Sequence, residues 1–568
     1  MYNGIAASRG IGIGSICRLV EHDLSFEAKM VEDTEAEKKR FQEAIDSFVE
    51  DTNAMADDIR KNIGPKEAEI LLGHAVMMSD PAMSGEMFKM IGSGQCAESA
   101  LTAVCDMFIG MFSNMEDEMM RQRASDIADV KVSVLKKLLG IEDVDIKNVA
   151  PGTVLVCKDL TPSMTSQIVK ENVAGIITEV GGKTSHSAIL ARALEIPAVL
   201  SVSGIVDKVS DKDTAIVDGT EGEVFINPDG DVLSKYLIKR EEFLAKKAEL
   251  QKFVGKKTRT ADDKELELFC NIGTPRDAKK AMECDGEGIG LFRTEFLFMD
   301  NTHYPTEEEQ FEAYKEAVLT MESRTVIIRT LDIGGDKDIP YLGLKKEENP
   351  FLGYRAVRYC LDNVDDYKIQ LRAIIRASAY GKVKIMVPLV TTVDEMRSVK
   401  KLVEEIKAEL KEEGVPFDNG IDVGCMVETA SASQIADLIA KEADFFSIGT
   451  NDLTQYTMAV DRGNADVAYL YSAFQPSVLR SIKNIIKCAN DAGIPVGMCG
   501  EAAADPLMIP LLISFGLDEY SVNPVLVLTA RCIISKWTKA EADELAEKVM
   551  AMDTKDEIVA ALKAAAKE

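Results

Sequence analysis

The feature that most constrains the fold of this chain is a regular alternation of strand-sized apolar runs and helix-sized stretches from residue 255 onward. The runs are Glu267–Asn271, Gly288–Phe292, Thr325–Arg329, Val383–Pro388, Asp422–Val427, Phe445–Ile448, Pro495–Met498 and Glu519–Val522. Eight strands that alternate with helices over about 300 residues are typical of a (β/α)₈ TIM barrel, whose active site lies at the C-terminal ends of the strands. The sequence therefore predicts a barrel and directs the search for chemistry to its strand ends.

Charged side chains stand at or just past these predicted ends. Arg293 and Arg329 carry planar guanidinium groups that match phosphate and carboxylate oxygens, although each can equally form a structural salt bridge. Glu428 and Asp452 end neighbouring strands, where two carboxylates with water and phosphate oxygens suffice to hold Mg²⁺. The alternative is that both carboxylates cap the helices that follow. Asn451 can hydrogen-bond either a ligand oxygen or the loop backbone.

Cys499 lies between two glycines, in the run Gly497-Met498-Cys499-Gly500, at the end of the seventh predicted strand. A thiol exposed at the mouth of a barrel can give or take a proton. Buried cysteines are common and mostly inert, so the alternative interpretation of Cys499 is a packing residue.

Residues 24–140 show the spacing of amphipathic helices. Two apolar stripes and two further candidates indicate four helices: Phe41, Ile45 and Phe48; Ile127, Val130, Val134 and Leu138; Glu67–Met78; and Glu98–Phe112. Four helices joined by short loops fit an antiparallel bundle.

Short β-rich runs surround this helical segment, namely Thr153–Cys157, Gly175–Thr178, Ala215–Val217 and Val224–Ile226, with further β-rich sequence in Gly4–Cys17. The bundle is therefore predicted to be inserted into an α/β domain. The charged stretch Leu233–Phe253 is expected to form a helix that leads to the barrel. The predicted parts are residues 1–22 with 145–228 for the α/β domain, 23–144 for the bundle, 229–254 for the linker helix and 255–568 for the barrel.

The chain is strongly acidic, with a formal net charge of -29 and a pI near 4.7. This charge argues against nucleic acid or an anionic membrane surface as a partner, and favours a basic protein or a metal-neutralised anionic substrate. It also fits a protein that is merely kept in solution by its charge. Eleven cysteines without a C-x-x-C pair, no leader-like segment and no apolar run of about 18 residues predict a cytoplasmic protein with no membrane insertion.

Of the four histidines, His186 has the most distinctive surroundings, because Gly181-Gly182-Lys183-Thr184-Ser185 precedes it and a predicted helix follows it. A glycine pair, two hydroxyls and a helix N-terminus suit an anion near the imidazole. Neutral imidazole is a competent phosphoryl acceptor. A histidine at a helix start is more often a structural hydrogen-bonding residue, so the loop alone favours a structural role and leaves the chemical one open.

Several further runs accompany the histidine loop in a fixed order: Gly4–Ser8, Arg123–Ile127, Asp159–Ser163, Gly288–Glu295, Asp332–Lys337, Asn349–Arg355, Gly449–Tyr456 and Asp461–Gly463. Together they resemble the Enzyme I family of the phosphoenolpyruvate:sugar phosphotransferase system, the phosphoenolpyruvate-protein phosphotransferases. The resemblance spans nearly the whole chain.

The resemblance implies that His186 takes the phosphoryl group of phosphoenolpyruvate and passes it to a histidine of the carrier HPr, with release of pyruvate. Carried over by position, it implies that Cys499 protonates the enolate carbon and that Glu428 and Asp452 hold Mg²⁺. The residues implied to bind phosphoenolpyruvate are Arg293, Arg329, Lys337, Asn451, Asp452 and Arg462. Thr165 matches a family hydroxyl near the histidine.

The resemblance also implies a swivelling phosphohistidine domain, a bundle that receives HPr around Glu67–Met78, and a homodimer formed through the barrel. Three residues depart from the family pattern: Lys183 and Arg9, where Arg and Pro are common, and Ala128, where Arg is common. Lys183 keeps the charge and loses the fork of an arginine, so its phosphate contact is in doubt. Ala128 is expected to affect the bundle surface.

Two alternative functions fit parts of this sequence, one in a related group of enzymes and one in a different class of protein. Pyruvate phosphate dikinases and phosphoenolpyruvate synthases resemble the histidine loop and the barrel, but they add a large ATP-binding domain that we do not expect here. A regulator that only senses phosphoenolpyruvate would be expected to lack a chemical residue, and every expected one is present. An enzyme that phosphorylates another protein is therefore favoured.

Overall fold

The computed structural model describes residues 1–568 except 20–23, 63–71, 79, 114–117, 142–145, 161–163, 165–167, 183–184, 300, 335–338 and 568. The chain forms two compact units, residues 1–247 and 248–568. The finer division into four parts stays a prediction.

The first unit contains an eight-stranded mixed sheet in the order β1-β8-β7-β3-β4-β5-β6-β2. Its strands are β1 Tyr2–Asn3, β2 Ile5–Ser8, β3 Ile11–Leu19, β4 Thr153–Cys157, β5 Val173–Thr178, β6 Ala198–Leu200, β7 Thr214–Asp218 and β8 Glu223–Ile226. In β4, Leu155 and Cys157 pack on the side of α7 (His186–Ala193), and Val154 and Val156 pack on the side of α8 (Ile205–Lys208). Because successive side chains of a strand point to opposite faces, β4 contributes apolar side chains to the packing on both faces of the sheet.

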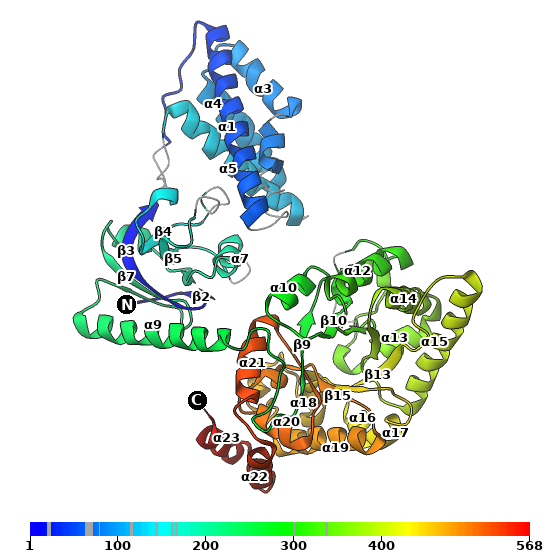
Figure 1. Cartoon of the computed structure of the whole chain (residues 1–568). Helices are drawn as coiled ribbons and strands as arrows, with labels where there is room; N and C mark the ends of the chain where they lie inside the picture. The colour runs from blue at the N-terminus through cyan, green and yellow to red at the C-terminus, as the bar shows by residue number, and fades with distance from the viewer. Residues whose placement is uncertain are drawn as a thin grey trace. The chain divides into compact units, whose positions relative to one another are not determined.

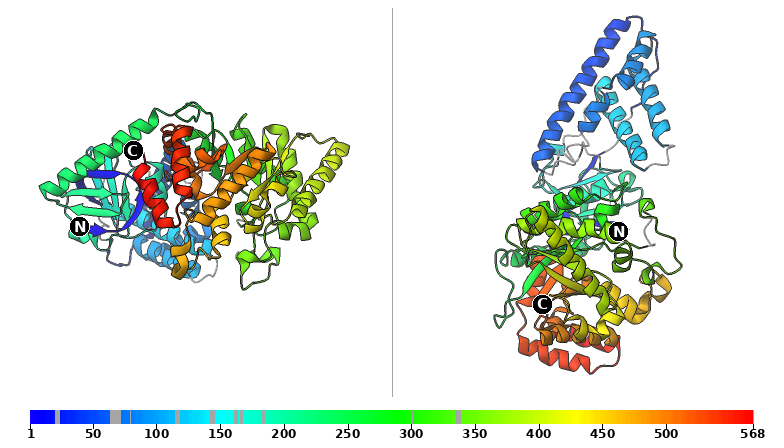
Figure 2. Two further views of the ribbon diagram at one scale, coloured as in Figure 1. Left: turned by 90° about the horizontal axis from the view of Figure 1, so that it is seen from below. Right: turned by 90° about the vertical axis from the view of Figure 1, so that its right-hand side faces the viewer.

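The helical bundle enters the chain between two neighbouring parallel strands, because β3 pairs directly with β4 although more than a hundred residues separate them. Its helices are α1 Thr34–Asn62, α3 Pro81–Gly92, α4 Ala97–Ser113 and α5 Glu118–Leu139, and they run side by side (Figure 1 and Figure 2). Phe41, Leu101 and Val134 are completely buried in the bundle core. The predicted insertion of a helical bundle into an α/β domain is confirmed.

Helix α3 was missed by the sequence analysis. Pro81 and Gly85 discourage a helix prediction, but Pro81 is the first residue of α3, where the missing N–H costs nothing. The expected helix Glu67–Met78 is described only for residues 72–78, which are helical, and residues 67–71 lie outside the described residues.

The stretch expected to be the linker helix forms α9, which begins at Gly230 and ends at Gln251. Tyr236 of α9 packs against Phe225, with ring centroids 5.0 Å apart, and its hydroxyl donates to Glu223 Oε2 at 2.6 Å. The first turns of α9 are thereby attached to the sheet of the first unit.

The second unit is a closed barrel of eight parallel strands. They are β9 Glu267–Ile272, β10 Ile289–Arg293, β11 Val326–Arg329, β12 Val383–Val387, β13 Asp422–Val427, β14 Phe446–Ile448, β15 Val496–Met498 and β16 Glu519–Val522. Strand β16 pairs with β9 and closes the ring. Each strand overlaps one of the eight predicted runs, so the barrel prediction is confirmed.

Helices surround these strands (Figure 1). They are α10 Asp277–Glu283, α11 Glu295–Met299, α12 Glu307–Thr320, α13 Val357–Asp362, α14 Val364–Ala377, α15 Val393–Glu413, α16 Ala430–Gln434, α17 Ala436–Ile439, α18 Thr450–Met458, α19 Pro476–Ala492, α20 Ile509–Phe515, α21 Val527–Ile534, α22 Lys539–Met550 and α23 Lys555–Ala565. The outward side chains of the strands pack against the helices in one large apolar core. A separate cluster that includes Leu291, Met426 and Cys499 fills the inside of the barrel. Among the described residues, no helix combines the length and the apolar character that a bilayer crossing requires.

Candidate active site at the barrel mouth and the histidine loop

The closed barrel brings the predicted site residues of five strands to one end, because the C-terminal ends of parallel strands lie together. Arg293 and Arg329 are the last residues of β10 and β11, and Glu428 directly follows β13. Asp452 lies in the first turn of α18, after β14, and Cys499 directly follows β15. Lys337 lies outside the described residues.

Arg329 is buried and is held by two carboxylates. Its Nη2 donates to Glu295 Oε1 at 2.8 Å, and its Nη1 lies 3.0 Å from Asp332 Oδ2. Arg355 also contacts Asp332, since its Nη2 and Nε donate to Asp332 Oδ1 at 2.6 and 3.1 Å. These contacts fix the guanidinium of Arg329 before any ligand arrives.

The charges in this network influence one another strongly. Burial raises the pKa of Glu295, and the nearby Arg329 only partly offsets the increase. Burial alone would also raise the pKa of Asp332, but the guanidiniums of Arg329 and Arg355 hold it below its ordinary value. Burial would lower the pKa of Arg329, yet Glu295 and Asp332 raise it, so this arginine keeps its charge.

Glu428 and Asp452 form the second buried acidic group of the mouth, with exposed fractions of 1% and 7%. Leu389 N donates to Glu428 Oε1 at 2.7 Å. Burial and the Asp452 carboxylate raise the pKa of Glu428 well above its ordinary value. Asp452 Oδ1 is buried and has no hydrogen-bond partner among the described residues, with Arg462 Nη1 3.5 Å away.

Glu428 and Asp452 have the chemical character of ligands for a divalent cation. Two buried neighbouring carboxyl groups, one with an oxygen that has no hydrogen-bond partner among the described residues, are the donors that a hard divalent cation prefers. No cluster of three or more His, Cys, Asp or Glu side chains suited to a metal occurs within the described ranges. Glu428 and Asp452 therefore fit Mg²⁺ that completes its coordination with water and substrate oxygens, as Mg²⁺ usually does.

Two polar residues complete this side of the mouth. Arg462 is exposed and lies over the ring of Phe351, 5.8 Å from the ring centroid, while Gln455 Oε1 accepts from its backbone N–H at 3.1 Å. Asn451 Oδ1 accepts from Glu501 N at 3.4 Å, so its amide nitrogen is left for other partners. Arg462 and Asn451, which are predicted to bind the substrate, therefore both have side chains at the mouth.

Cys499 is 3% exposed and lies at the inner edge of the mouth. Burial raises the pKa of its thiol to about 11. The thiol therefore stays protonated at neutral pH and is suited to donate a proton rather than to act as a nucleophile. Its sulfur lies 3.8 Å from the carbonyl oxygen of Ile448.

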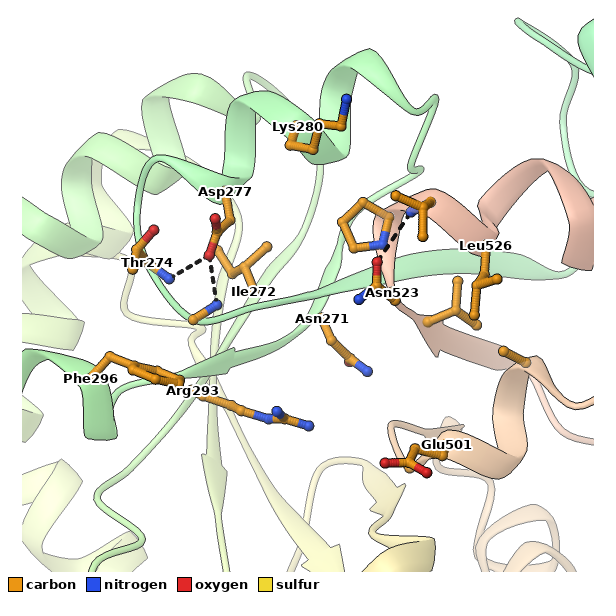
Figure 3. A pocket seen from close by; sticks show the side chains of 16 residues that line it. Asn271, Ile272, Thr274, Asp277, Lys280, Arg293, Phe296, Glu501, Asn523 and Leu526 are labelled. Carbon is orange, nitrogen blue, oxygen red and sulfur yellow. Dashed lines mark hydrogen bonds between the residues drawn. The ribbon is translucent and has the colours of Figure 1, made fainter. Parts of the chain in front are cut away.

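An open cavity of about 730 Å³ occupies the mouth between β9, β10, β15 and β16. Figure 3 shows Arg293 and Glu501 reaching into this cavity, from β10 and from the turn after β15. Gly273 N and Thr274 N donate to Asp277 Oδ2 at 3.0 and 2.8 Å and hold the cavity wall. The exposed guanidinium of Arg293 is thus available to an anionic ligand.

The histidine loop lies in the first unit. His186 is the first residue of α7, and the side chain of the N-cap residue Ser185 accepts from Ala188 N at 3.3 Å. Ser187 donates to Asp159 Oδ1 at 2.8 Å, and Gly181 has a φ of 116° that favours glycine. The predicted helix start at His186 is confirmed. The side chain of His186 and residues Lys183, Thr184 and Thr165 lie outside the described residues.

The other departures from the family pattern lie on the surface. Arg9 is exposed between β2 and β3, and Ala128 is half-buried on α5. Neither belongs to the mouth or to the histidine loop.

Sequence reasoning missed three residues of the mouth, Glu295, Asp332 and Arg355. All three stand in runs that carry the family resemblance, but a carboxylate or an arginine in a loop does not reveal its partner. The signal that could have found them is position, because Glu295 and Asp332 follow the ends of β10 and β11 within three residues.

Three family models match the chain. They are described as PEP-utilising enzyme, N-terminal, over residues 3–123; PEP-utilising enzyme, mobile domain, over residues 149–222; and PEP-utilising enzyme, PEP-binding domain, over residues 247–539. The matches extend over both compact units.

Curated relatives match over almost their whole length. The phosphoenolpyruvate-protein phosphotransferase of Priestia megaterium is 45% identical over 98% of this chain and 97% of its own. That of Bacillus subtilis (strain 168) is 46% identical over 99% of this chain and 98% of its own. An NMR solution structure of Enzyme I (nEIt) aligns with 43% of this chain and 99% of its own, at 34% identity and a TM-score of 0.40.

Proposed function

This chain belongs to the family of phosphoenolpyruvate-protein phosphotransferases, and on that premise we propose that it transfers the phosphoryl group of phosphoenolpyruvate to His186 and then to a histidine of the carrier HPr. Pyruvate is the second product. The observation that carries the proposal is the meeting of arginines, buried carboxylates and a protonated thiol at one barrel mouth. Phosphoryl transfer needs mainly alignment and charge neutralisation, and these residues supply both.

The mouth binds phosphoenolpyruvate through its arginines. Arg293 and Arg462 are exposed and can approach the phosphate and the carboxylate, while Arg329 is held in place by Glu295 and Asp332. Lys337 and Asn451 complete the proposed binding set. A guanidinium that is already oriented loses little conformational freedom when the substrate arrives.

Mg²⁺ is the proposed cofactor, held by Glu428 and Asp452. Four arginines of the mouth (Arg293, Arg329, Arg355 and Arg462) face four carboxylates (Glu295, Asp332, Glu428 and Asp452), so these side chains do not by themselves supply the positive charge that a phosphate ester with a carboxylate requires. When bound, the ion neutralises charge that develops on the transferring phosphoryl group.

Cys499 is proposed to finish the donor half of the reaction. When the phosphoryl group leaves, the remaining enolate takes a proton at its methylene carbon. The S–H bond of Cys499 breaks and a C–H bond forms, which gives pyruvate and leaves a thiolate. The raised pKa of the thiol keeps this proton in place until the enolate appears.

The helical bundle is the proposed binding site of HPr. Val76, Met107 and Met111 are exposed on it, and the chain as a whole is strongly acidic. A surface with apolar and acidic character suits a basic carrier. Reorientation of the histidine domain between donor and acceptor, and a homodimer through the barrel, are proposals that rest on family membership alone.

Labelling with ³²P-phosphoenolpyruvate and Mg²⁺ tests the proposal. The wild-type chain is expected to take an acid-labile, base-stable label, which His186→Ala abolishes. His303→Ala is the matched control, because His303 is an exposed histidine of the barrel unit paired with Glu309 at 3.2 Å, and it keeps the label. Label that survives in His186→Ala would overturn the assignment, as would carrier-independent formation of phosphoenolpyruvate from ATP and pyruvate.

A further inference from the structure

A buried carboxyl group lies inside the barrel, away from the residues of the mouth. Glu519 is the first residue of β16, at the N-terminal end of the strand, and it is 6% exposed. Its Oε1 is buried and has no hydrogen-bond partner among the described residues. An acidic side chain is rarely buried without a partner, so this one calls for a physical explanation.

Two glycines make room for this carboxyl group. A Cβ atom on Gly497 would lie 1.8 Å from Glu519 Oε2, and a Cβ atom on Gly290 would lie 2.4 Å from Glu519 Oε1. Any side chain at either position would therefore displace the carboxyl group. The barrel interior has room for Glu519 because Gly290 on β10 and Gly497 on β15 have no side chain.

The surroundings favour the neutral acid. Burial raises the pKa of Glu519 well above its ordinary value, and Glu267 on β9 and the adjacent Asp518 raise it further. Lys384 on β12 opposes them and does not overcome the burial. Glu267 is the register partner of Glu519 and is exposed. The surroundings of Glu519 therefore favour its protonated form, and the exposed residue Glu267 lies next to it on the neighbouring strand.

A buried hydroxyl group lies on the inner face of the barrel at the register level of Glu519. Gly497 is the register partner of both Ser447 on β14 and Glu519 on β16, so no side chain of β15 separates the two at this level. Ser447 is completely buried, and its Oγ makes no well-aligned hydrogen bond within the described part of the chain. Burial raises the pKa of Cys499, and the neighbouring Ser447 hydroxyl lowers it.

The thiol of Cys499 has limited access to water. Cys499 is 3% exposed, whereas the next residues, Gly500 and Glu501, line the open cavity. A thiolate formed there by proton donation needs a proton before the next turnover. The Ser447 hydroxyl and the Glu519 carboxyl are buried polar groups on the same inner face of the barrel, neither with a well-aligned partner among the described residues. Such groups are commonly joined through a buried water.

We propose that Glu519 returns a proton to Cys499 through Ser447 in every catalytic cycle, an inference that rests on the proposed role of Cys499. The thiolate takes the proton of the Ser447 hydroxyl, that oxygen takes a proton from one buried water molecule, and the water takes the proton of the Glu519 carboxyl group. A new S–H bond forms, the O–H bond of Glu519 breaks, and Ser447 is unchanged. The Glu519 carboxylate then regains a proton from water through Glu267, so the net source is the solvent at the N-terminal end of the barrel.

The proposal predicts a kinetic signature that a structural role would not give. Rapid-quench measurement of pyruvate, with full-length protein, phosphoenolpyruvate, Mg²⁺ and excess HPr, separates the first turnover from later ones. Glu519→Gln is expected to release its first pyruvate within about twofold of the wild-type rate and later ones at least about tenfold more slowly. The reason is that Cys499 already carries a proton for the first turnover. The variant is slow only in supplying the new proton that Cys499 needs for each later turnover.

Ser447→Ala is the second variant and is expected to show the same burst. Among the described residues its hydroxyl makes no well-aligned hydrogen bond, so its removal breaks none there. The matched control is Ser433→Ala on α16, outside the barrel interior, which removes another buried hydroxyl that has no partner among the residues that the structure describes. This variant is expected to keep linear turnover.

Three results would overturn the relay. They are unchanged steady turnover in Glu519→Gln, a first turnover slowed as much as the later ones, and a linear time course in Ser447→Ala. Failure of the proposed function itself is distinguishable, because wild-type protein would then take no label from phosphoenolpyruvate at His186.

Discussion

Arg329 Nη2 lies 2.8 Å from Glu295 Oε1, and both side chains are almost completely buried at the barrel mouth. The arginine that is expected to meet the substrate phosphate is thus positioned by the protein's own carboxylates. A buried pair of this kind contributes little net stability, but the loss of one partner leaves an uncompensated charge. Its value here lies in orientation, since a guanidinium fixed in advance contributes more to alignment of the reacting groups.

Substitution of Glu295 by Gln is expected to disturb both stability and substrate binding. The variant keeps the shape of the side chain and removes the charge that faces Arg329. We expect a decrease of about 3 kcal/mol in the free energy of unfolding, measured by urea denaturation, and an increase of about tenfold in the KM for phosphoenolpyruvate.

The matched control for this substitution is Glu308→Gln. Glu308 pairs with Arg376 at the same distance of 2.8 Å, but its side chain is 64% exposed. An exposed pair contributes less than about 1 kcal/mol, so this variant is expected to resemble the wild type in both measurements. Equal effects of the two substitutions would contradict a special role for the buried pair.

The carboxylates Glu428 and Asp452 are expected to bind the metal together. Asp452→Asn should weaken Mg²⁺ binding, measured by calorimetry in the presence of phosphoenolpyruvate, by at least about tenfold. Chelation of the metal should abolish labelling of the wild-type protein. Asp466→Asn is the control, because Asp466 is exposed in the 3₁₀ helix Ala465–Leu470 that follows α18. Unchanged metal affinity in Asp452→Asn would place the cation elsewhere.

Cys499→Ala is expected to slow turnover while the affinity for phosphoenolpyruvate stays within about twofold of the wild type, because a proton donor acts on the reaction rather than on substrate binding. The control is Cys425→Ala. Cys425 is also buried, but it lies on β13 and packs in the outer apolar core. Its substitution should therefore lower stability and leave turnover unchanged. Loss of binding in Cys499→Ala would indicate a packing residue instead.

Much of the barrel could be predicted from sequence because its strands are buried on both faces. Val326–Arg329 is buried along its whole length, and such strands are continuous apolar runs that stand out between amphipathic helices. The helix α3 could not be predicted in the same way. Its proline and glycine suggest a turn, and only its packing against α4 and α1 makes the segment a helix.

The candidate site was predictable only where a strand end marked it. Arg293, Arg329, Glu428, Asp452 and Cys499 could be found from their positions after apolar runs, whatever their partners. The pairing of these and other charged side chains could not be predicted from sequence. The contact between Arg355 and Asp332, for example, depends on how a loop folds back over the mouth. The same limit applies to Glu519, since an acidic residue at the start of a strand gives no sign that two distant glycines enclose it.

The stability of the first unit is expected to depend on pH through the buried side chain of Asp129. Burial raises the pKa of Asp129 on α5 from 3.8 to about 6, against the effect of His74. Between about pH 4 and pH 6 the folded chain therefore binds this proton more tightly than the unfolded chain, so its free energy of unfolding falls as the pH rises through this range and stays lowered above it. Asp129→Asn removes the cost of burying the charge.

We expect Asp129→Asn to raise the free energy of unfolding at pH 7.5 by up to about 3 kcal/mol and to flatten its dependence on pH between about 4 and 6. Below this range the two proteins should converge, because Asp129 is then protonated in both states. Asp106→Asn is the control, since Asp106 is half-exposed and pairs with Lys131 at 2.7 Å, and it should lower stability slightly or not at all. A variant of Asp129 that is less stable than the wild type at pH 7.5 would mean that the carboxylate is charged in the folded chain and compensated by a partner such as His74, and that the bundle depends on this charge.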